Sequence, residues 1–110
     1  MTFLYLNSDK MGHGEPQLGR KLMASFLKEL AESSVQVDMI GCVNDGIFLT
    51  TEGSPVIDSL KRMKEDGAQI ATCGTCLDYH QRQDKLLIGD VGTMDQTVDI
   101  MGMADKVIQP

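Results

Sequence analysis

Two cysteines, three positions apart, are the residues of this sequence best suited to chemistry. Cys73 and Cys76 stand in the segment ATCGTCLD, separated by Gly74 and Thr75. Such a pair can be a redox disulfide, half of a metal site, a sulfur carrier or two inert core residues. The pair lies between a predicted strand and a predicted helix, and a thiol at a helix N-terminus faces amides that favour the thiolate. We therefore expect a reactive thiol here, the alternative being two small residues at a tight turn.

A metal site would need more ligands than this pair supplies, since structural zinc takes four protein ligands and catalytic zinc takes three. The other soft side chains are Cys42, His13 and His80. Cys42 stands in an apolar predicted strand, which indicates a buried core thiol. His80 is predicted to face solvent. His13 lies between two glycines, where it could donate a proton or contact an anion, although an ordinary loop residue is the simpler interpretation. We expect no metal and no cofactor.

A glycine-rich segment at residues 8–15 also follows a predicted strand and precedes a predicted helix, as phosphate-binding loops do. It lacks the Gly-Lys-Ser/Thr ending of a P-loop and the three-glycine spacing of a dinucleotide fingerprint. The sequence therefore gives little support to a nucleotide site.

The elements that must position these residues alternate between strand and helix patterns. Short apolar runs predict strands at residues 2–7, 35–43, 68–72, 85–89 and 106–109. Helical periodicity and capping signals predict helices at 16–32, 55–66, 76–81 and 93–104, with Ser54 and Thr75 as N-caps and Pro16 and Pro55 in first turns. Residues 47–50 could form an extra strand or an extended loop. Gly46 is predicted to take a positive φ in the turn before them.

Strands that alternate with helices form parallel βαβ units with right-handed crossovers. We expect one α/β domain over residues 1–110, with three α/β/α layers and a flavodoxin-like, mainly parallel sheet of about five strands. Ligands of such sheets bind in loops outside the carboxyl ends of the strands. These loops are predicted at residues 8–15, 44–51, 73–78 and 90–94.

Composition excludes several classes of partner. The chain has 110 residues, of which 42% are hydrophobic and 24% charged, as is typical of a packed domain. Its net charge of −6, without a cluster of basic and aromatic residues, argues against nucleic acid. The apolar run at residues 2–6 is too short for a signal peptide or a membrane span, so we expect a cytoplasmic protein that binds no membrane. Met94, Met101 and Met103 are predicted to be core residues or subunit contacts.

Several of these segments resemble the DsrE/DsrF-like sulfur-relay family, and most closely its YedF branch, which is linked to selenium metabolism. They are Met11-Gly12-x-Gly14, Leu18-Gly19-x-Lys21-Leu22-Met23, Asn44-x-Gly46, Leu49-Thr50, Gly53-Ser54-Pro55-Val56 and, most specifically, CGTCLD at 73–78. They extend over nearly the whole chain. One departure is Gly92-Thr93-Met94, where the YedF branch has Thr-Asn-Met or Ser-Asn-Met.

The resemblance implies a cysteine that accepts sulfane sulfur or selenium as a persulfide or its selenium analogue and passes it on. The relay cysteine of the family corresponds to Cys73, whereas the helix-terminus argument favours Cys76. We rank Cys73 first, with Cys76 resolving it as a disulfide or stabilising its thiolate. The remaining candidate site residues are Met11, Gly12, His13, Gly14, Asn44, Gly46, Gly74, Thr75, Asp78, Thr93 and Met94.

The resemblance further implies a homo-oligomer and protein partners that donate and accept sulfur. A TusA-like protein acting in trans is one candidate, because YedF proteins also carry a TusA-like domain with its own cysteine. Two alternatives stay open: a thiol–disulfide redox protein that uses both cysteines, and a non-enzymatic oligomeric binding module. Against the redox alternative, none of Pro16, Pro55 and Pro110 is predicted to face the motif as a cis-proline.

Overall fold

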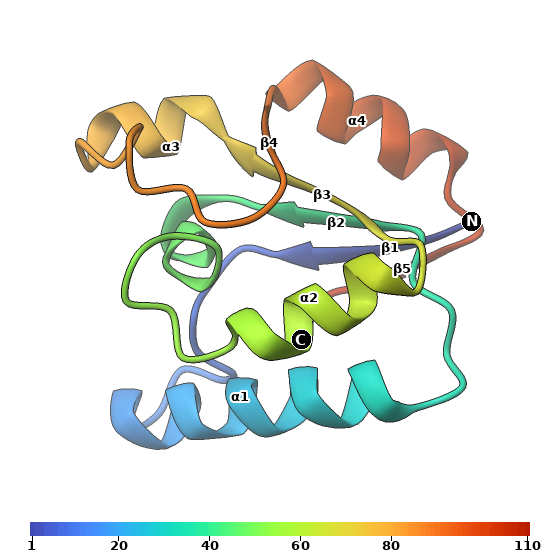
Figure 1. Cartoon of the computed structure of the whole chain (residues 1–110), viewed down its shortest axis with the longest axis horizontal. Coiled ribbons are helices and arrows are strands. Elements are labelled where there is room, and N and C mark those ends of the chain that lie inside the picture. Colours follow the sequence, from blue (N-terminus) through green and yellow to red (C-terminus); the bar gives the residue numbers. More distant parts are fainter.

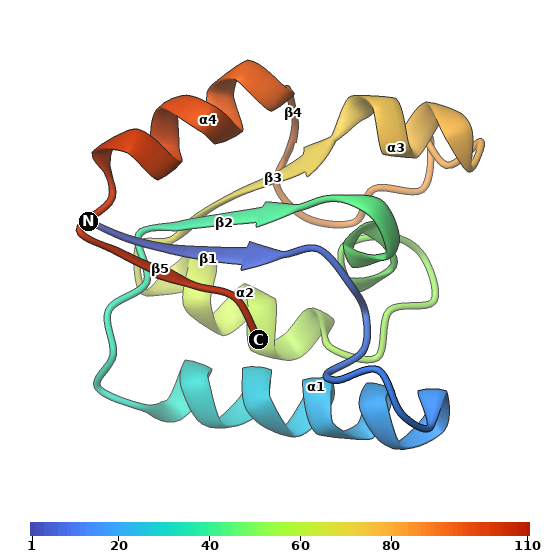
Figure 2. The same cartoon turned by 180° about the vertical axis from the view of Figure 1, so that it is seen from behind.

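Five parallel strands form one sheet, as the alternating pattern predicts. The computed structural model describes all residues from 1 to 110. Its strands are β1 (Thr2–Leu6), β2 (Met39–Cys42), β3 (Gln69–Cys73), β4 (Asp90–Gly92) and β5 (Lys106–Ile108). Their order across the sheet is β4-β3-β2-β1-β5. The chain therefore steps in one direction from β1 to β4 and then crosses the sheet to β5, which Figure 2 shows beside β1 at the far edge from β4.

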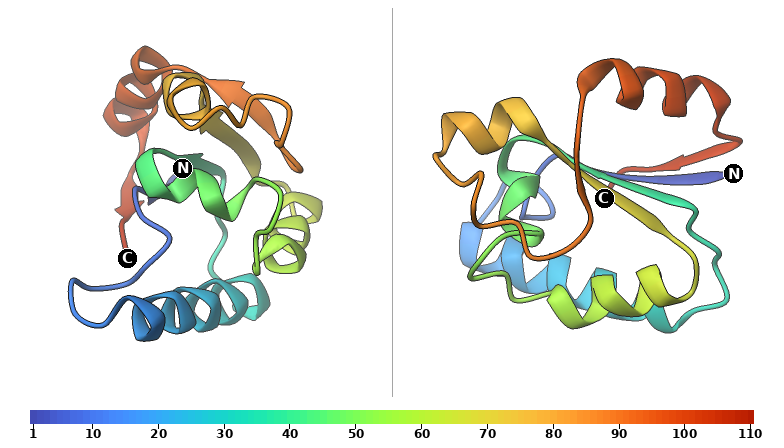
Figure 3. Two further views of the ribbon diagram at one scale, coloured as in Figure 1. Left: turned by 90° about the vertical axis from the view of Figure 1, so that its left-hand side faces the viewer. Right: turned by 45° about the horizontal axis from the view of Figure 1, so that its top comes forward.

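Helices lie on both faces of the sheet, which confirms the predicted α/β architecture (Figure 1). Helices α1 (Pro16–Glu32) and α2 (Ile57–Glu65) share one face, and α4 (Met94–Met103) lies on the opposite face (Figure 3). Helix α3 (Gly74–Tyr79) continues directly from β3, and the 3-10 helix η1 (Asn44–Leu49) follows β2. None of these helices combines the length and the apolar composition needed to cross a bilayer.

The hydrophobic core lies between the sheet and the pair α1 and α2. Leu4, Leu6, Ile40 and Ile70 enter it from the strands, and Met23, Leu27, Leu60 and Met63 enter it from the helices. In α1 the buried residues recur every four positions, the period that brings them to one face. This helix begins and ends at the predicted residues.

The opposite face of the sheet is covered far less completely. No residue of α4 is buried. Met94, Met101 and Met103 are exposed, Met103 at 66% of its surface, so their interpretation as core residues is wrong. Their role as subunit contacts stays a prediction. The loose packing of α4 leaves room between this helix and the strands.

The fourth strand is not where the apolar run at 85–89 places it. Ile88 is buried in the core beneath the sheet, and Leu86 makes only an isolated antiparallel bridge with Thr51. Gly89 then turns the chain at a φ of 77°, so that β4 begins at Asp90. The apolar run therefore serves as a covering loop.

Two further elements begin later than predicted. Ser54 Oγ donates to the Leu49 carbonyl (2.6 Å) and accepts from the Val56 amide (3.1 Å), which holds a turn before α2 and delays its start to Ile57. The carboxylate of Asp38 accepts from the Thr2 amide (2.7 Å), and β2 begins only at the next residue, Met39.

The segment at residues 47–50 belongs largely to η1 and forms neither a strand nor an extended loop. The positive φ predicted for Gly46 belongs instead to Asn44, whose φ is 51°. Gly46 is needed for a close approach, because a Cβ at this position would lie 2.0 Å from the Leu6 carbonyl oxygen. The missing side chain lets η1 lie directly against the end of β1.

We expect Gly46→Ala to lower the free energy of unfolding by about 3 kcal/mol, because the clashing atom is backbone and cannot rotate away. Urea unfolding followed by circular dichroism measures this loss. Gly102→Ala is the matched control, since Gly102 lies in α4 with no atom within reach of an added Cβ, and there alanine should gain about 0.5–1 kcal/mol. Equal stability of the two variants would contradict the close-approach role.

Candidate functional site

The carboxyl ends of β3 and β4 bring Cys73 next to the start of α4. Cys73 pairs with Gly92 in the parallel ladder, and Thr93 follows as the N-cap of α4. The Thr93 hydroxyl accepts from the Gln96 amide (3.4 Å), and the Gln96 side chain accepts from the Thr93 amide (3.1 Å). This capping box fixes the chain beside Cys73.

Helix α3 begins two residues earlier than predicted, with Cys73 itself at the N-cap position. Thr75 is therefore not the cap, and Thr75 and Asp78 are exposed on the helix. The turn is tight because Gly74 lies against β4, where an added Cβ would be 3.0 Å from Val91 Cγ1. The early start places Cys76 within the first turn of α3.

Cys76 is held by an amide from a separate segment of the chain. The Asn44 N–H donates to Cys76 Sγ at 3.1 Å. Asn44 adopts the left-handed conformation, which asparagine enters more readily than most residues. The start of η1 therefore positions one of the two thiols.

The surroundings of Cys76 keep its proton in place. Burial is the largest cause that raises the pKa of the Cys76 thiol, because it disfavours the charged form. The Asn44 amide opposes this shift by stabilising the thiolate, whereas a hydrogen bond with Cys73 and the charge on Cys73 raise the pKa further. Both cysteines are free thiols. Cys76 is thus suited to donate a hydrogen bond to a Cys73 thiolate.

Cys73, unlike Cys76, opens into a cleft of about 400 Å³ between the sheet and α4. Phe3, Met39 and Ala71 line the cleft from the strands, and Ile100 and Met103 line it from α4. Thr93 and Met94 also line the cleft, so the structure brings these two predicted site residues together with Cys73. A reactant in the cleft would meet the Cys73 sulfur.

The glycine-rich loop after β1 does not join this cleft. Gly12, His13 and Gly14 line a separate, polar pocket of about 370 Å³. The Met11 amide donates to the Gly19 carbonyl (3.0 Å), and the Met11 side chain packs against the core. Four predicted site residues are therefore placed apart from the cysteine pair.

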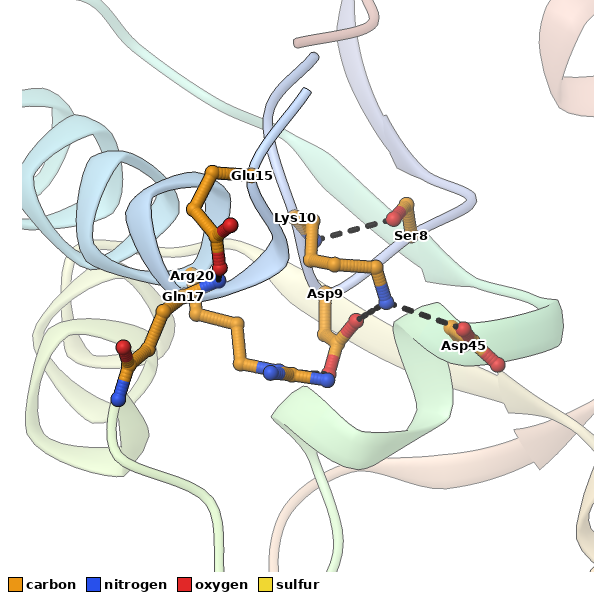
Figure 4. A network of polar contacts seen from close by, with 7 residues as sticks. All are labelled: Ser8, Asp9, Lys10, Glu15, Gln17, Arg20 and Asp45. Atoms are coloured by element: carbon orange, nitrogen blue, oxygen red, sulfur yellow. Dashed lines mark hydrogen bonds and ion pairs between the residues drawn. The ribbon is translucent and has the colours of Figure 1, made fainter. Parts of the chain in front are cut away.

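An ion-pair network nevertheless connects this loop to η1 (Figure 4). Lys10 Nζ contacts Asp9 Oδ1 at 2.7 Å and Asp45 Oδ2 at 3.2 Å, and Arg20 Nε contacts Asp9 Oδ2 at 3.4 Å. The hydrogen bond with Asp9 is the main cause that raises the pKa of Lys10. Asp45 follows Asn44 directly, so the network supports the segment that holds Cys76. Sequence reasoning missed Lys10 and Asp45, because no local pattern marks a pair 35 residues apart.

A hydrogen bond between two buried threonine hydroxyls connects the end of η1 to β3. Thr50 Oγ1 and Thr72 Oγ1 lie 2.7 Å apart, and both residues are fully buried. Thr72 immediately precedes Cys73, so this hydrogen bond fixes the end of the strand that presents the thiol. The two threonines were not predicted as site residues, since each stands in an apolar run.

The remaining soft side chains take no part in the cysteine pair. Cys42 is a buried core thiol, as predicted, and burial raises its pKa to about 12. His80 is half-buried, with its ring edge-on to that of Phe48 at 5.1 Å, and does not simply face solvent. No group of three or more His, Cys, Asp or Glu side chains is arranged to hold a metal ion.

We expect Asn44→Val to lower stability by about 1–2 kcal/mol, because a β-branched residue is strained at positive φ, and to raise the Cys76 pKa further as the amide moves away. Asn44→Gly is the matched control and should preserve both properties. Urea unfolding and the pH dependence of Cys76 alkylation, in a Cys73→Ser background, measure the two effects. Indistinguishable Val and Gly variants would contradict the positioning role of the Asn44 turn.

Comparisons with known proteins identify the fold of the chain. No protein-family model matches it, and no curated protein matches it in sequence. Among solved structures it is similar to MTH1491 from Methanobacterium thermoautotrophicum, a protein of unknown function. That likeness has a TM-score of 0.72 at 16% identity and covers 99% of this chain and 97% of the other.

The chain is also similar to the ychN protein from E. coli, with a TM-score of 0.64 at 16% identity. This match covers 99% of this chain and 98% of the other. Both likenesses extend over nearly the full length of each chain. The protein therefore has a fold of the DsrE/YchN type.

Proposed function

We propose that this protein is a DsrE-like sulfur-relay protein in which Cys73 carries sulfane sulfur as a persulfide. The observation that carries the proposal is that the two thiols have different surroundings. Cys73 opens into the cleft, whereas Cys76 is bound by the Asn44 amide and keeps its proton. One thiol is free to react, and its neighbour can stabilise it.

The transfer step is a nucleophilic displacement at sulfur. The Cys73 thiolate attacks the outer sulfur of a persulfide R–S–SH, the new sulfur–sulfur bond forms, and the old bond breaks. The group R–S leaves as the thiolate R–S⁻ with the electron pair of that bond, and Cys73 becomes Cys73–S–SH. No oxidant or reductant is consumed. Transfer to an acceptor thiolate reverses these roles.

Several finer features belong to the proposal. The relay would take place in the cytoplasm, in a homo-oligomer, with protein donors and acceptors such as a TusA-like protein. Selenium in place of sulfur, as in the YedF branch, is chemically possible at the same thiol. The acidic net charge favours partners with a basic face.

A thiol–disulfide redox role is the second candidate, because Cys73 is the N-cap of α3 and Cys76 lies in the first turn of the same helix. Oxidation would join the two sulfurs and remove two hydrogens. The two functions therefore leave products of different mass on the same residues.

We expect the reduced protein, incubated with an organic persulfide, to gain the mass of about one sulfur atom per chain. Cys73→Ser should abolish the gain, because the nucleophile is lost. Cys76→Ala should keep it at a rate reduced about tenfold, because a hydrogen-bond donor to the Cys73 thiolate is lost. Intact-mass measurement of the three proteins gives the answer.

The double variant Cys73→Ser/Cys76→Ser is the control for this experiment, since it keeps only the buried Cys42 thiol and should gain no sulfur. Labelling that persists in Cys73→Ser would contradict the relay role of Cys73. A loss of two hydrogens without any gain of sulfur would favour the redox function instead.

A further inference from the structure

We propose that the cleft beside Cys73 binds the apolar body of a small thiol-bearing molecule that also carries a neutral or positive group. Anionic thiols bind the cleft less well. This inference rests on the proposed function, since it names the class of molecule whose sulfur would meet Cys73. The cleft volume of about 400 Å³ lies within the usual range of small-molecule sites. More than half of the residues that line it, 12 of 20, are hydrophobic.

Two uncharged polar side chains on the α4 side of the cleft already have partners within the protein. The Gln96 carbonyl oxygen accepts from the Thr93 amide (3.1 Å), and the Thr97 hydroxyl donates to the Thr93 carbonyl (3.3 Å). These groups are thus occupied in holding the helix start. A ligand would therefore gain mainly from apolar contacts with Phe3, Ala71 and Ile100.

The charges around the cleft have one sign. Asp90 and Asp99 line it, and no Lys, Arg or His side chain does. A negative rim repels anions and attracts cations, the more so at low ionic strength. Anionic thiols are thereby disfavoured as occupants, and a positively charged group is favoured.

The position of the two aspartates sets where that positive group would lie. Asp90 pairs with Ala71 in the ladder, two residues before the pair of Cys73 with Gly92. Two residues of strand span about 7 Å. Asp99 is on α4, five residues beyond Met94. A fitting ligand therefore has its sulfur at one end and its cation at the other, separated by several methylene groups.

Two disulfide probes of equal length test this geometry: the disulfide of 6-aminohexane-1-thiol, which is cationic, and that of 6-mercaptohexanoic acid, which is anionic. In a Cys76→Ser background the Cys73 thiolate attacks one sulfur of the probe, forms a mixed disulfide and releases one thiolate. Intact mass follows the rate. The rate of each probe with the protein is divided by the rate of the same probe with a neutral model thiol. This division cancels any difference in intrinsic reactivity between the two disulfides.

We expect saturable kinetics and a cationic probe that reacts about tenfold faster than the anionic one at low salt, with the ratio falling as salt is added. The double variant Asp90→Asn/Asp99→Asn should bring the ratio close to one. Asp84→Asn removes an acidic charge outside the cleft and should leave the ratio unchanged. Rates that are linear in probe concentration and equal for the two charges would overturn the inference.

Filling the cleft provides a second measurement that does not depend on charge. Ala71→Leu places a larger side chain on its floor and should abolish saturation, while iodoacetamide still alkylates Cys73 and circular dichroism stays unchanged. If Ala71→Leu instead dissociates an oligomer while the reaction still saturates with probe concentration, the cleft is a contact surface for a second copy of the chain. That result would overturn the inference. The charge comparison stands even if this variant fails to fold.

The two proposals can fail separately. Uptake of sulfur by Cys73 without discrimination between the probes overturns the ligand cleft and leaves the relay intact. Discrimination between the probes without uptake of sulfur from any persulfide overturns the relay and leaves the cleft.

Discussion

The close approach of η1 to the end of β1 is the constraint on which the cysteine site depends. Gly46 lies so near the Leu6 carbonyl that no side chain fits between them. This contact places Asn44 where its amide reaches Cys76, and it places Thr50 where its hydroxyl reaches Thr72. Lys10 adds an ion pair with Asp45 from the loop after β1. Three strand ends are thereby fixed relative to one another before any ligand binds.

The consequence is that two chemically identical thiols in one short motif have different surroundings. Cys76 accepts a hydrogen bond from a backbone amide, and burial is the largest cause that raises the pKa of its thiol. Cys73 stands at the last position of β3, where the sheet, α4 and solvent meet at the cleft. Nucleophile and stabiliser are distinguished by position and not by residue type. A relay that must hold sulfur and release it again benefits from such a division, since a neutral donor steadies the thiolate without competing for the sulfur.

Patterns within single elements could be predicted from the sequence, and contacts between elements could not. The period of α1 and the alternation of strands and helices have local causes, so α1, the parallel sheet and the position of Cys73 at a strand end are as predicted. The prediction of a strand at 85–89 was wrong because a buried loop and a buried strand have the same apolar composition. Glycine at position 46 indicates either a positive φ or a close contact, and only the position of Leu6 decides between them. The cleft arises because α4 packs loosely, a property of the whole fold that no motif in this helix reveals.

The order in which the thiols react tests the division of roles most directly. The reduced protein is treated with limiting iodoacetamide across a range of pH, and each cysteine is quantified by peptide mass. We predict that Cys73 is labelled first. Labelling of Cys76 should rise only at a higher pH than the labelling of a model thiol does, because the pKa of Cys76 is raised. Faster labelling of Cys76, or equal labelling of both residues at every pH, would contradict the assignment of Cys73 as the reactive thiol.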